Sequence, residues 1–223
     1  MTRDQVQKGI YVVINPVVRG LIRIGFTPNV VTTVGFLLNA GVAVVFIFGA
    51  REGSRGDLSY VGWAGGLVLF AGLFDMLDGQ VARLGNMSSV FGALYDSVLD
   101  RYSELLMFLG ICYYLVAYHY FLSSLSAFLA LIGSMMVSYT RARSEGLGIQ
   151  NRGGLMQRPE RIILVGLSAI ACGVTAHFIG FTYKGIETIS IFTLPLAVMA
   201  VLTNITAIRR LLDAREALEK QGK

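Results

Sequence analysis

The sequence predicts an all-α integral membrane protein with six transmembrane helices and an amphipathic helix at its N-terminus. Of its 223 residues, 54% are hydrophobic and only 15% are charged, and the mean hydropathy is +0.63. Soluble domains carry about 25% charged residues. No linker composition divides the chain, so we expect one membrane domain over residues 30–210, with a cytosolic arm at 1–29 and a cytosolic tail at 211–223.

The first expected element lies in the N-terminal arm. Apolar residues recur there at helical spacing, at Ile10, Val13, Ile14, Val17, Leu21 and Ile24. Lys8, Arg19 and Arg23 lie elsewhere on the helical wheel, and the arginines interrupt any spanning core. This pattern is typical of a helix lying in the membrane interface. A helix packed on the protein without lipid contact is the alternative.

Six apolar segments follow the arm. A helix needs about 20 mostly apolar residues to cross the hydrocarbon. The segments are Val30–Ala50, Tyr60–Arg83, Ser88–Tyr118, Phe121–Tyr139, Arg161–Phe181 and Ile186–Ile208. The third is long enough to project into the cytosol, and the last turns of the second contain two aspartates.

Basic residues predict the orientation of these spans. Lys and Arg concentrate in the arm, in the loop after the fourth span and in the tail, whereas the alternate connections hold few or offset charges. Because basic flanks resist translocation, we expect both termini on the cytosolic face of the plasma membrane. The net charge of +5 reflects this bias. Nucleic-acid binding would need a basic soluble module, so we expect no nucleic-acid partner.

Four aspartates interrupt the second and third segments. Asp75 and Asp78 are three residues apart, and Asp96 and Asp100 are four apart, so each pair lies on one helix face. On insertion scales a charge at the centre of a spanning helix costs about 2.5 to 3.5 kcal/mol, which calls for a compensating reason. If "RLGNMSS" closes a hairpin at the cytosolic end, the four carboxylates face one another.

Such a cluster predicts a site for divalent cations. Neighbouring carboxylates repel one another unless a cation lies among them. Oxygen ligands without Cys or nearby His suit Mg²⁺ or Mn²⁺, and four acids could hold two ions that clamp both oxygens of a phosphoryl displacement. Helix-end acids paired with Arg83 and Arg101 are the alternative. Small residues around the acids leave room for a phosphate-bearing ligand, which Arg83 could hold in a bidentate fork.

The stretch "DMLDGQVARLGNMSSVFGALYDSVLD" resembles the signature of the CDP-alcohol phosphotransferases. It reads D-x-x-D-G-x-x-A-R, a spacer, and G-x-x-x-D-x-x-x-D, with every fixed position present. The segment "TPNVVTTVG" is similar to the P-N-x-x-T that contacts the nucleotide in this family. The resemblance implies transfer of a phosphatidyl group from CDP-diacylglycerol to an alcohol, with release of CMP, by a homodimer in the lipid bilayer.

The resemblance also implies roles for individual residues. Asp75, Asp78 and Asp96 would ligate two metal ions, Mg²⁺ or Mn²⁺, that bridge the pyrophosphate. Asp100 would complete the second metal's shell and act as the general base on the acceptor hydroxyl. The residues expected to hold CDP-diacylglycerol are Asn29, Val30, Val31, Thr32, Gly79, Arg83 and Ser89.

The acceptor alcohol is predicted from residues outside the shared signature. "DSVLDRYSE" departs from the D-P-x-A-D-K form similar to phosphatidylglycerophosphate synthases. Together with "YTRARSEGLG" it resembles the actinobacterial phosphatidylinositol-phosphate synthases, which implies inositol 1-phosphate as the acceptor. We expect Arg141, Arg158 and Arg161 on its phosphate. Glycerol 3-phosphate is the alternative acceptor, because cytosolic loops are basic in any case.

Two other classes of function stay open at this stage. A cation transporter would use intramembrane acids, but the outer halves "GWAGGLVLF" and "FLGICYYLV" hold no charge to continue a path. A non-catalytic assembly protein would use Gly62 and Gly66 as a G-x-x-x-G packing face.

Overall fold

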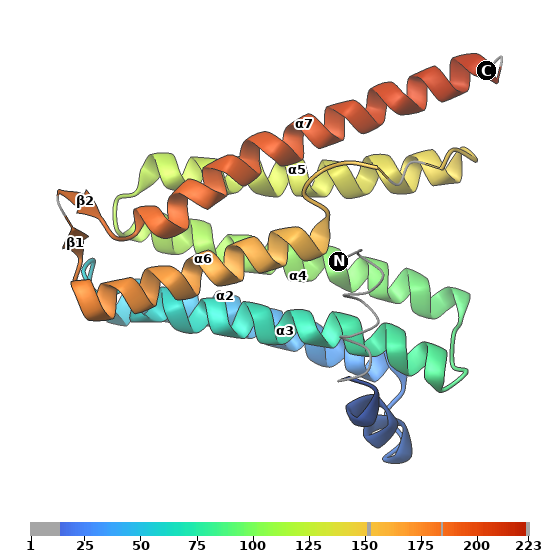
Figure 1. The fold of residues 1–223 in the computed structure, drawn as a ribbon, viewed down its shortest axis with the longest axis horizontal. Coiled ribbons are helices and arrows are strands. Elements are labelled where there is room, and N and C mark those ends of the chain that lie inside the picture. Colours follow the sequence, from blue (N-terminus) through green and yellow to red (C-terminus); the bar gives the residue numbers. More distant parts are fainter. Residues whose placement is uncertain (1–13, 151–152, 184, 222–223) are drawn as a thin grey trace, which may run out of the picture.

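A computed structural model describes residues 14–150, 153–183 and 185–221 of the chain. The described part is a bundle of long helices with one two-stranded hairpin (Figure 1). Residues 14–23 are helical. The later elements are α2 (Pro28–Glu52), α3 (Ser59–Leu84), α4 (Val90–Ala117), α5 (Phe121–Gly146), α6 (Arg158–Ile179), β1 (Thr182–Tyr183), β2 (Ile186–Glu187) and α7 (Ser190–Lys220). The all-α prediction is confirmed.

The ends of the helices differ in places from the sequence prediction. The last span was expected to begin at Ile186, but residues 186–187 form β2, which pairs antiparallel with β1, and α7 begins at Ser190. At its other end α7 continues to Lys220, so most of the expected tail extends the last helix. The division into arm, membrane domain and tail stays a prediction, and residues 1–13, 151–152, 184 and 222–223 lie outside the described part.

Five helices in the described part are long and apolar enough to cross a membrane: α2, α3, α5, α6 and α7. The expected third span, α4, does not meet this criterion. Every 18-residue window of this 28-residue helix includes Asp100, Arg101 and Glu104. Helix α4 packs against α2 and α5, and its charged residues Asp100 and Glu104 pair with Arg158 and Arg161 of α6.

The long helices pack as neighbouring pairs, with α5 on α7, α2 on α4 and α3 on both α2 and α6. Glycines allow the closest approach of α3 and α6: a Cβ added to Gly62 would lie 3.1 Å from the Cα of Gly173. Gly66 has nothing within 4 Å of such a Cβ. The glycine pair considered for assembly is therefore divided, because Gly62 already packs inside the chain.

The main hydrophobic core fills the half of the bundle near the β-hairpin. Phe46 of α2 is fully buried and stacks on Phe192 of α7 at 6.0 Å between ring centroids. Its edge contact with Tyr114 of α4 spans 5.8 Å. Aromatic contacts of this geometry stabilise beyond the area they bury. The core thus fixes how α2, α4 and α7 are arranged.

The helix over residues 14–23 lies across the opposite end of the bundle (Figure 1). Val18 is fully buried in a small cluster with Val31 of α2 and Val81 of α3. Val17 and Ile24 of the same apolar stripe stay 55% and 70% exposed. Part of the stripe therefore packs on protein, and part stays open for the predicted interfacial contact. Ile10 and Val13 lie outside the described residues.

Candidate active site

The hairpin between α3 and α4 closes at the end of the bundle opposite the β-hairpin (Figure 1). Asn86 turns the chain with a φ of 52°, and the amide of Met87 donates to the carbonyl of Ala82 at 2.9 Å. Ser89 caps α4 by accepting a hydrogen bond from the amide of Gly92 at 2.9 Å. This short turn brings the aspartates of α3 and α4 to one region.

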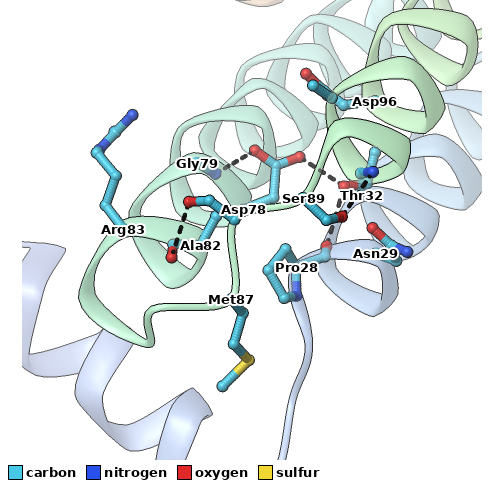
Figure 2. A pocket seen from close by; sticks show the side chains of 13 residues that line it. Pro28, Asn29, Thr32, Asp78, Gly79, Ala82, Arg83, Met87, Ser89 and Asp96 are labelled. Atoms are coloured by element: carbon cyan, nitrogen blue, oxygen red, sulfur yellow. Dashed lines mark hydrogen bonds between the residues drawn. The ribbon is translucent and has the colours of Figure 1, made fainter.

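The first of these, Asp78, is 5% exposed and hydrogen-bonded on both carboxylate oxygens. Thr32 Oγ1 of α2 donates to Oδ2 at 2.9 Å, and the amide of Gly79 donates to Oδ1. Figure 2 shows the carboxylate between these donors. Thr32 belongs to the "PNVVT" segment, so the two sequence motifs meet at this contact.

A cavity of about 220 Å³, here called the α2–α4 cavity, opens beside Asp78 (Figure 2). Its lining includes Asn29, Thr32, Gly79, Arg83, Ser89, Asp78 and Asp96. Five of the seven residues expected to hold CDP-diacylglycerol therefore surround one space. Val30 and Val31 do not line this cavity, because Val30 is exposed and Val31 is buried with Val18. Asn29 and Thr32 are three residues apart and share the helix face toward the cavity, which the two valines between them do not.

Glycines keep the α2–α4 cavity open. A Cβ on Gly79 would meet the guanidinium nitrogens of Arg83 at 3.5 Å. A Cβ on Gly92 would lie 2.9 Å from Ser89 Oγ and 3.4 Å from Asn29 Oδ1. Side chains at these two positions would take up room where the polar groups of three helices meet.

A second cavity of about 360 Å³, here called the arginine cavity, lies on the other side of the aspartates. Its charged lining residues are Asp96, Asp100, Arg101, Arg141, Glu145, Arg158, Arg161 and Arg210. All three arginines expected on the acceptor phosphate are present. Asp96 lines both cavities, so the aspartate region lies between two polar spaces.

Arg158, the first residue of α6, joins the two pairs of aspartates. Its Nη2 lies 2.7 Å from Asp75 Oδ2 and its Nη1 lies 2.6 Å from Asp100 Oδ1. Asp75 Oδ2 is buried and makes no hydrogen bond, so its short contact with Arg158 is an ion pair without hydrogen-bond alignment. One guanidinium thus neutralises carboxylates from two different helices.

The four aspartates fit a divalent cation by the chemistry of their donors. They offer hard carboxylate oxygens, one of them buried without a hydrogen bond, and a cationic guanidinium already lies among them. Within the described residues, no three acidic, His or Cys side chains converge on a single point. Asp78 is directed to Thr32, whereas Asp75 and Asp100 are directed to Arg158.

The other arginines of the cavity differ in how they are held. Arg161 is 1% exposed and makes two hydrogen bonds to Glu104, at 2.7 and 3.0 Å, and one to the carbonyl of Met156 at 2.8 Å. Arg141 pairs with Glu145, at 3.0 Å, one turn along α5. The predicted contacts of both with an acceptor phosphate stay predictions.

Glu104 and Arg210 were not among the residues predicted from sequence. Glu104 lies one turn after Asp100 on α4, and this four-residue spacing, which continues the face of Asp96 and Asp100, is the signal that marks it. Arg210 of α7 is 3% exposed and donates to the carbonyls of Gly153 and Val137, at 2.9 and 2.7 Å. Both residues anchor the walls of the arginine cavity.

Comparison with known proteins identifies the family. The model of the CDP-alcohol phosphatidyltransferases matches residues 26–205, well over half of the chain. The chain belongs to this family. It is therefore a member of a transferase family, and its apolar helices make it a multi-pass membrane protein.

The relatives include phosphatidylinositol phosphate synthases. That of Mycobacterium tuberculosis is 37% identical over 154 residues, which cover 67% of this chain and 65% of the relative. Its crystal structure with CDP-DAG bound matches with a TM-score of 0.72 and 30% identity, over 89% of this chain and 92% of the other. Its complex with manganese and citrate matches with a TM-score of 0.73 and 29% identity, over 89% and 87%.

Proposed function

We propose that this protein transfers the phosphatidyl group of CDP-diacylglycerol to a hydroxyl of inositol 1-phosphate, forming phosphatidylinositol phosphate and CMP. The observation that carries the proposal is the place of Asp96 in both cavities, because a transferase must hold donor and acceptor on either side of its reacting groups. The similarity to phosphatidylinositol phosphate synthases supports this acceptor.

On the donor side, the α2–α4 cavity holds the nucleotide and its phosphates. Asn29, Thr32 and Ser89 supply polar groups, and Arg83 supplies a guanidinium for a phosphate. The cavity lies among helices whose outer faces are apolar, so the acyl chains of the lipid extend into the bilayer.

On the acceptor side, the arginine cavity holds the phosphate of inositol 1-phosphate. Arg141 and Arg158 supply donors directly, and Arg161 supplies the donors that Glu104 and Met156 leave. A guanidinium forms paired hydrogen bonds to phosphate oxygens, which favours a phosphorylated alcohol over the free alcohol.

The reaction is a displacement at the β-phosphorus. Divalent cations, two Mg²⁺ or Mn²⁺ bound by Asp75, Asp78, Asp96 and Asp100, would neutralise the charge that develops on the pyrophosphate. Asp100 lines the arginine cavity and accepts the proton of the attacking hydroxyl. The new bond joins the acceptor oxygen to the β-phosphorus, and the bond from that phosphorus to the bridging oxygen breaks to release CMP.

The membrane arrangement is part of the same proposal. Six helices, α4 included, cross the plasma membrane, with both termini and the aspartates at the cytosolic face and the N-terminal helix in the interface. The position of basic residues supports this orientation. Two copies form a homodimer. Labelling of single cysteines at residues 55 and 143 in intact cells tests the orientation, since only the first is expected to react from outside.

The experiment that tests the function is CMP release by the purified protein with CDP-diacylglycerol and Mg²⁺. Inositol 1-phosphate, free inositol and glycerol 3-phosphate are offered in parallel, with a chelator as the metal control. Turnover with inositol 1-phosphate alone supports the proposal. Turnover with glycerol 3-phosphate instead would overturn inositol 1-phosphate as the acceptor and leave the phosphatidyl transfer in place, because the arginine cavity suits the phosphate of either alcohol. No turnover with any acceptor contradicts the proposal.

A further inference from the structure

We infer that Arg158 is an internal counter-cation of the aspartate site and that metal binding releases it toward the acceptor. In the structure its guanidinium pairs with Asp75 and Asp100. When divalent cations occupy the aspartates, the guanidinium turns into the arginine cavity and becomes available to the acceptor's phosphate. This inference rests on the proposed function and adds a coupling between its two ligands.

The first support is the double contact of one guanidinium. Its two terminal nitrogens meet carboxylates on α3 and α4 at 2.7 and 2.6 Å. The three side chains are 13 to 18% exposed, so solvent screens these charges little. Carboxylates buried to this degree are costly without a cation. Arg158 removes that cost on two helices at once.

The second support is that the same oxygens cannot serve both cations. Asp75 Oδ2 and Asp100 Oδ1 each touch an arginine nitrogen at a distance that leaves no room for an ion between them. A guanidinium beside a divalent cation also repels it. The contact with Asp75 lacks hydrogen-bond alignment, so this half of the bridge is held by charge and is the easier half to exchange.

The third support is the anchoring of the Arg158 backbone. Gln157 and Glu160 form a capping box at the start of α6, and Pro159 follows Arg158 directly. Arg161 donates a hydrogen bond of 2.8 Å to the carbonyl of Met156, two residues before Arg158. The Cα of Arg158 is therefore fixed, and a long side chain on a fixed backbone changes partner by rotating about its own bonds.

The fourth support is the contrast with two neighbouring arginines of the arginine cavity. Arg161 is held by Glu104 in a buried pair of hydrogen bonds, and Arg210 by two backbone carbonyls. Their partners are structural groups that no metal is expected to take away. The partners of Arg158 are two of the proposed metal ligands, so metal binding acts selectively on Arg158.

The consequence is a reciprocal coupling of the two ligands. If metal raises the affinity for the acceptor's phosphate, the acceptor must raise the affinity for metal by the same factor. The coupling passes through one side chain: the metal displaces Arg158 from the aspartates, and the acceptor's phosphate draws it into the arginine cavity. Each ligand therefore favours the position of Arg158 that the other one needs.

The test compares the parent with Arg158→Gln, and uses Arg141→Gln as the matched control. Arg141 lines the same cavity but pairs with Glu145 of its own helix. Mn²⁺ binding to the detergent-purified proteins is measured by the electron paramagnetic resonance signal of free Mn²⁺, without lipid substrate. We expect Arg158→Gln to bind Mn²⁺ about tenfold more tightly, which is a modest change in binding free energy. Arg141→Gln should bind it as the parent does.

A second measurement addresses the coupling and the folding of the variants. Inositol 1-phosphate should bind the parent at least about fivefold more tightly with Mn²⁺ present, within the usual range of coupling between two sites. In Arg158→Gln this dependence should disappear. Arg158→Lys keeps the charge and should stay near the parent in Mn²⁺ affinity, which separates the counter-cation role from a loss of fold.

The outcomes distinguish this inference from the proposed function. Equal or weaker Mn²⁺ binding by Arg158→Gln overturns the counter-cation role, while CMP release by the parent would leave the proposed function intact. An absence of Mn²⁺ binding in the parent and in every variant overturns the proposed metal site together with the inference.

Discussion

The two ends of the bundle differ in how their polar groups are satisfied. At the β-hairpin end, Arg55, Tyr120 and Glu187 complete one another: Arg55 Nη2 lies 3.0 Å from Glu187 Oε1, and the Tyr120 hydroxyl donates to Glu187 Oε2 at 2.6 Å. Arg55 Cζ also lies 4.8 Å from the centre of the Tyr120 ring. These contacts join the α2–α3 loop, the α4–α5 loop and β2.

At the aspartate end the charges are paired, but not every buried polar atom is hydrogen-bonded. Asp75 Oδ2 lies 2.7 Å from Arg158 Nη2 in an ion pair without a hydrogen bond, and the buried Nε of Arg101 also makes none. Two cavities separate the helices where the opposite end has a packed aromatic core. Polar groups left unsatisfied in this way are a cost that a ligand is able to offset. The β-hairpin end therefore stabilises the bundle, whereas the aspartate end offers polar groups for a ligand.

The largest expected effect is the loss of turnover in Asp100→Asn. An amide keeps the shape of the side chain but does not accept the acceptor's proton, so kcat should fall by about 10² to 10⁴, the usual contribution of a general base. CDP-diacylglycerol binding should stay near that of the parent. Steady-state CMP release and a lipid-binding assay check the two parts. Equal kcat in the variant and the parent would refute the general-base role.

The next effect in size is expected at Glu104, whose carboxylate accepts two hydrogen bonds from Arg161. Glu104→Leu leaves the guanidinium of Arg161 buried without its partner, which should destabilise the protein by about 3 to 5 kcal/mol. The double variant Glu104→Leu with Arg161→Met should recover most of that stability. Thermal unfolding in detergent measures both. A single variant as stable as the parent would contradict the importance of this buried pair.

A smaller effect is expected at the α2–α4 cavity. The new methyl of Gly92→Ala would lie 2.9 Å from Ser89 Oγ, so KM for CDP-diacylglycerol should rise several-fold while KM for the acceptor stays unchanged. Gly146→Ala is the matched control, since a Cβ there has nothing within 4 Å. If Gly92→Ala instead raises KM for the acceptor alone, this cavity is not the donor site.

The smallest effect is expected at the β-hairpin end. Tyr120→Phe removes the hydrogen bond to Glu187 and should cost about 1 kcal/mol of stability, with kcat unchanged. Burial and that hydrogen bond raise the pKa of Tyr120 to about 12. Because the folded pKa lies above the unfolded value near 10, this stabilisation is complete below about pH 10 and is lost as pH rises toward 12.

The pH dependence is checked by unfolding the parent and Tyr120→Phe at pH 9 and at pH 11. The gap in melting temperature should narrow at the higher pH. A gap that is the same at both pH values would show that the hydroxyl has the same pKa in the folded and the unfolded protein, which would contradict the raised pKa. A change in kcat at pH 9 would mean that the two ends of the bundle are coupled.

Local patterns along the chain were sufficient for much of this molecule. These patterns are the spacing of the aspartates, the small residues near them and the apolar runs, each of which lies within one helix. They predicted the all-α bundle, the helical hairpin of α3 and α4, and the family. For α4 the span stays a prediction, because the charges of its first half leave no 18-residue window that meets the apolar criterion. The local patterns failed at Ile186, because a short hairpin carries no strong periodicity.

Read along the chain, the sequence shows which acids and arginines exist and which helix face carries each of them. Their partners became known from the packing of the helices. Val31 packs in the cluster with Val18, Arg161 donates to Glu104, and Arg158 pairs with two aspartates. The physical reason is that a charge finds its partner by distance in space, and residues 57 positions apart, such as Glu104 and Arg161, meet only after the helices have packed.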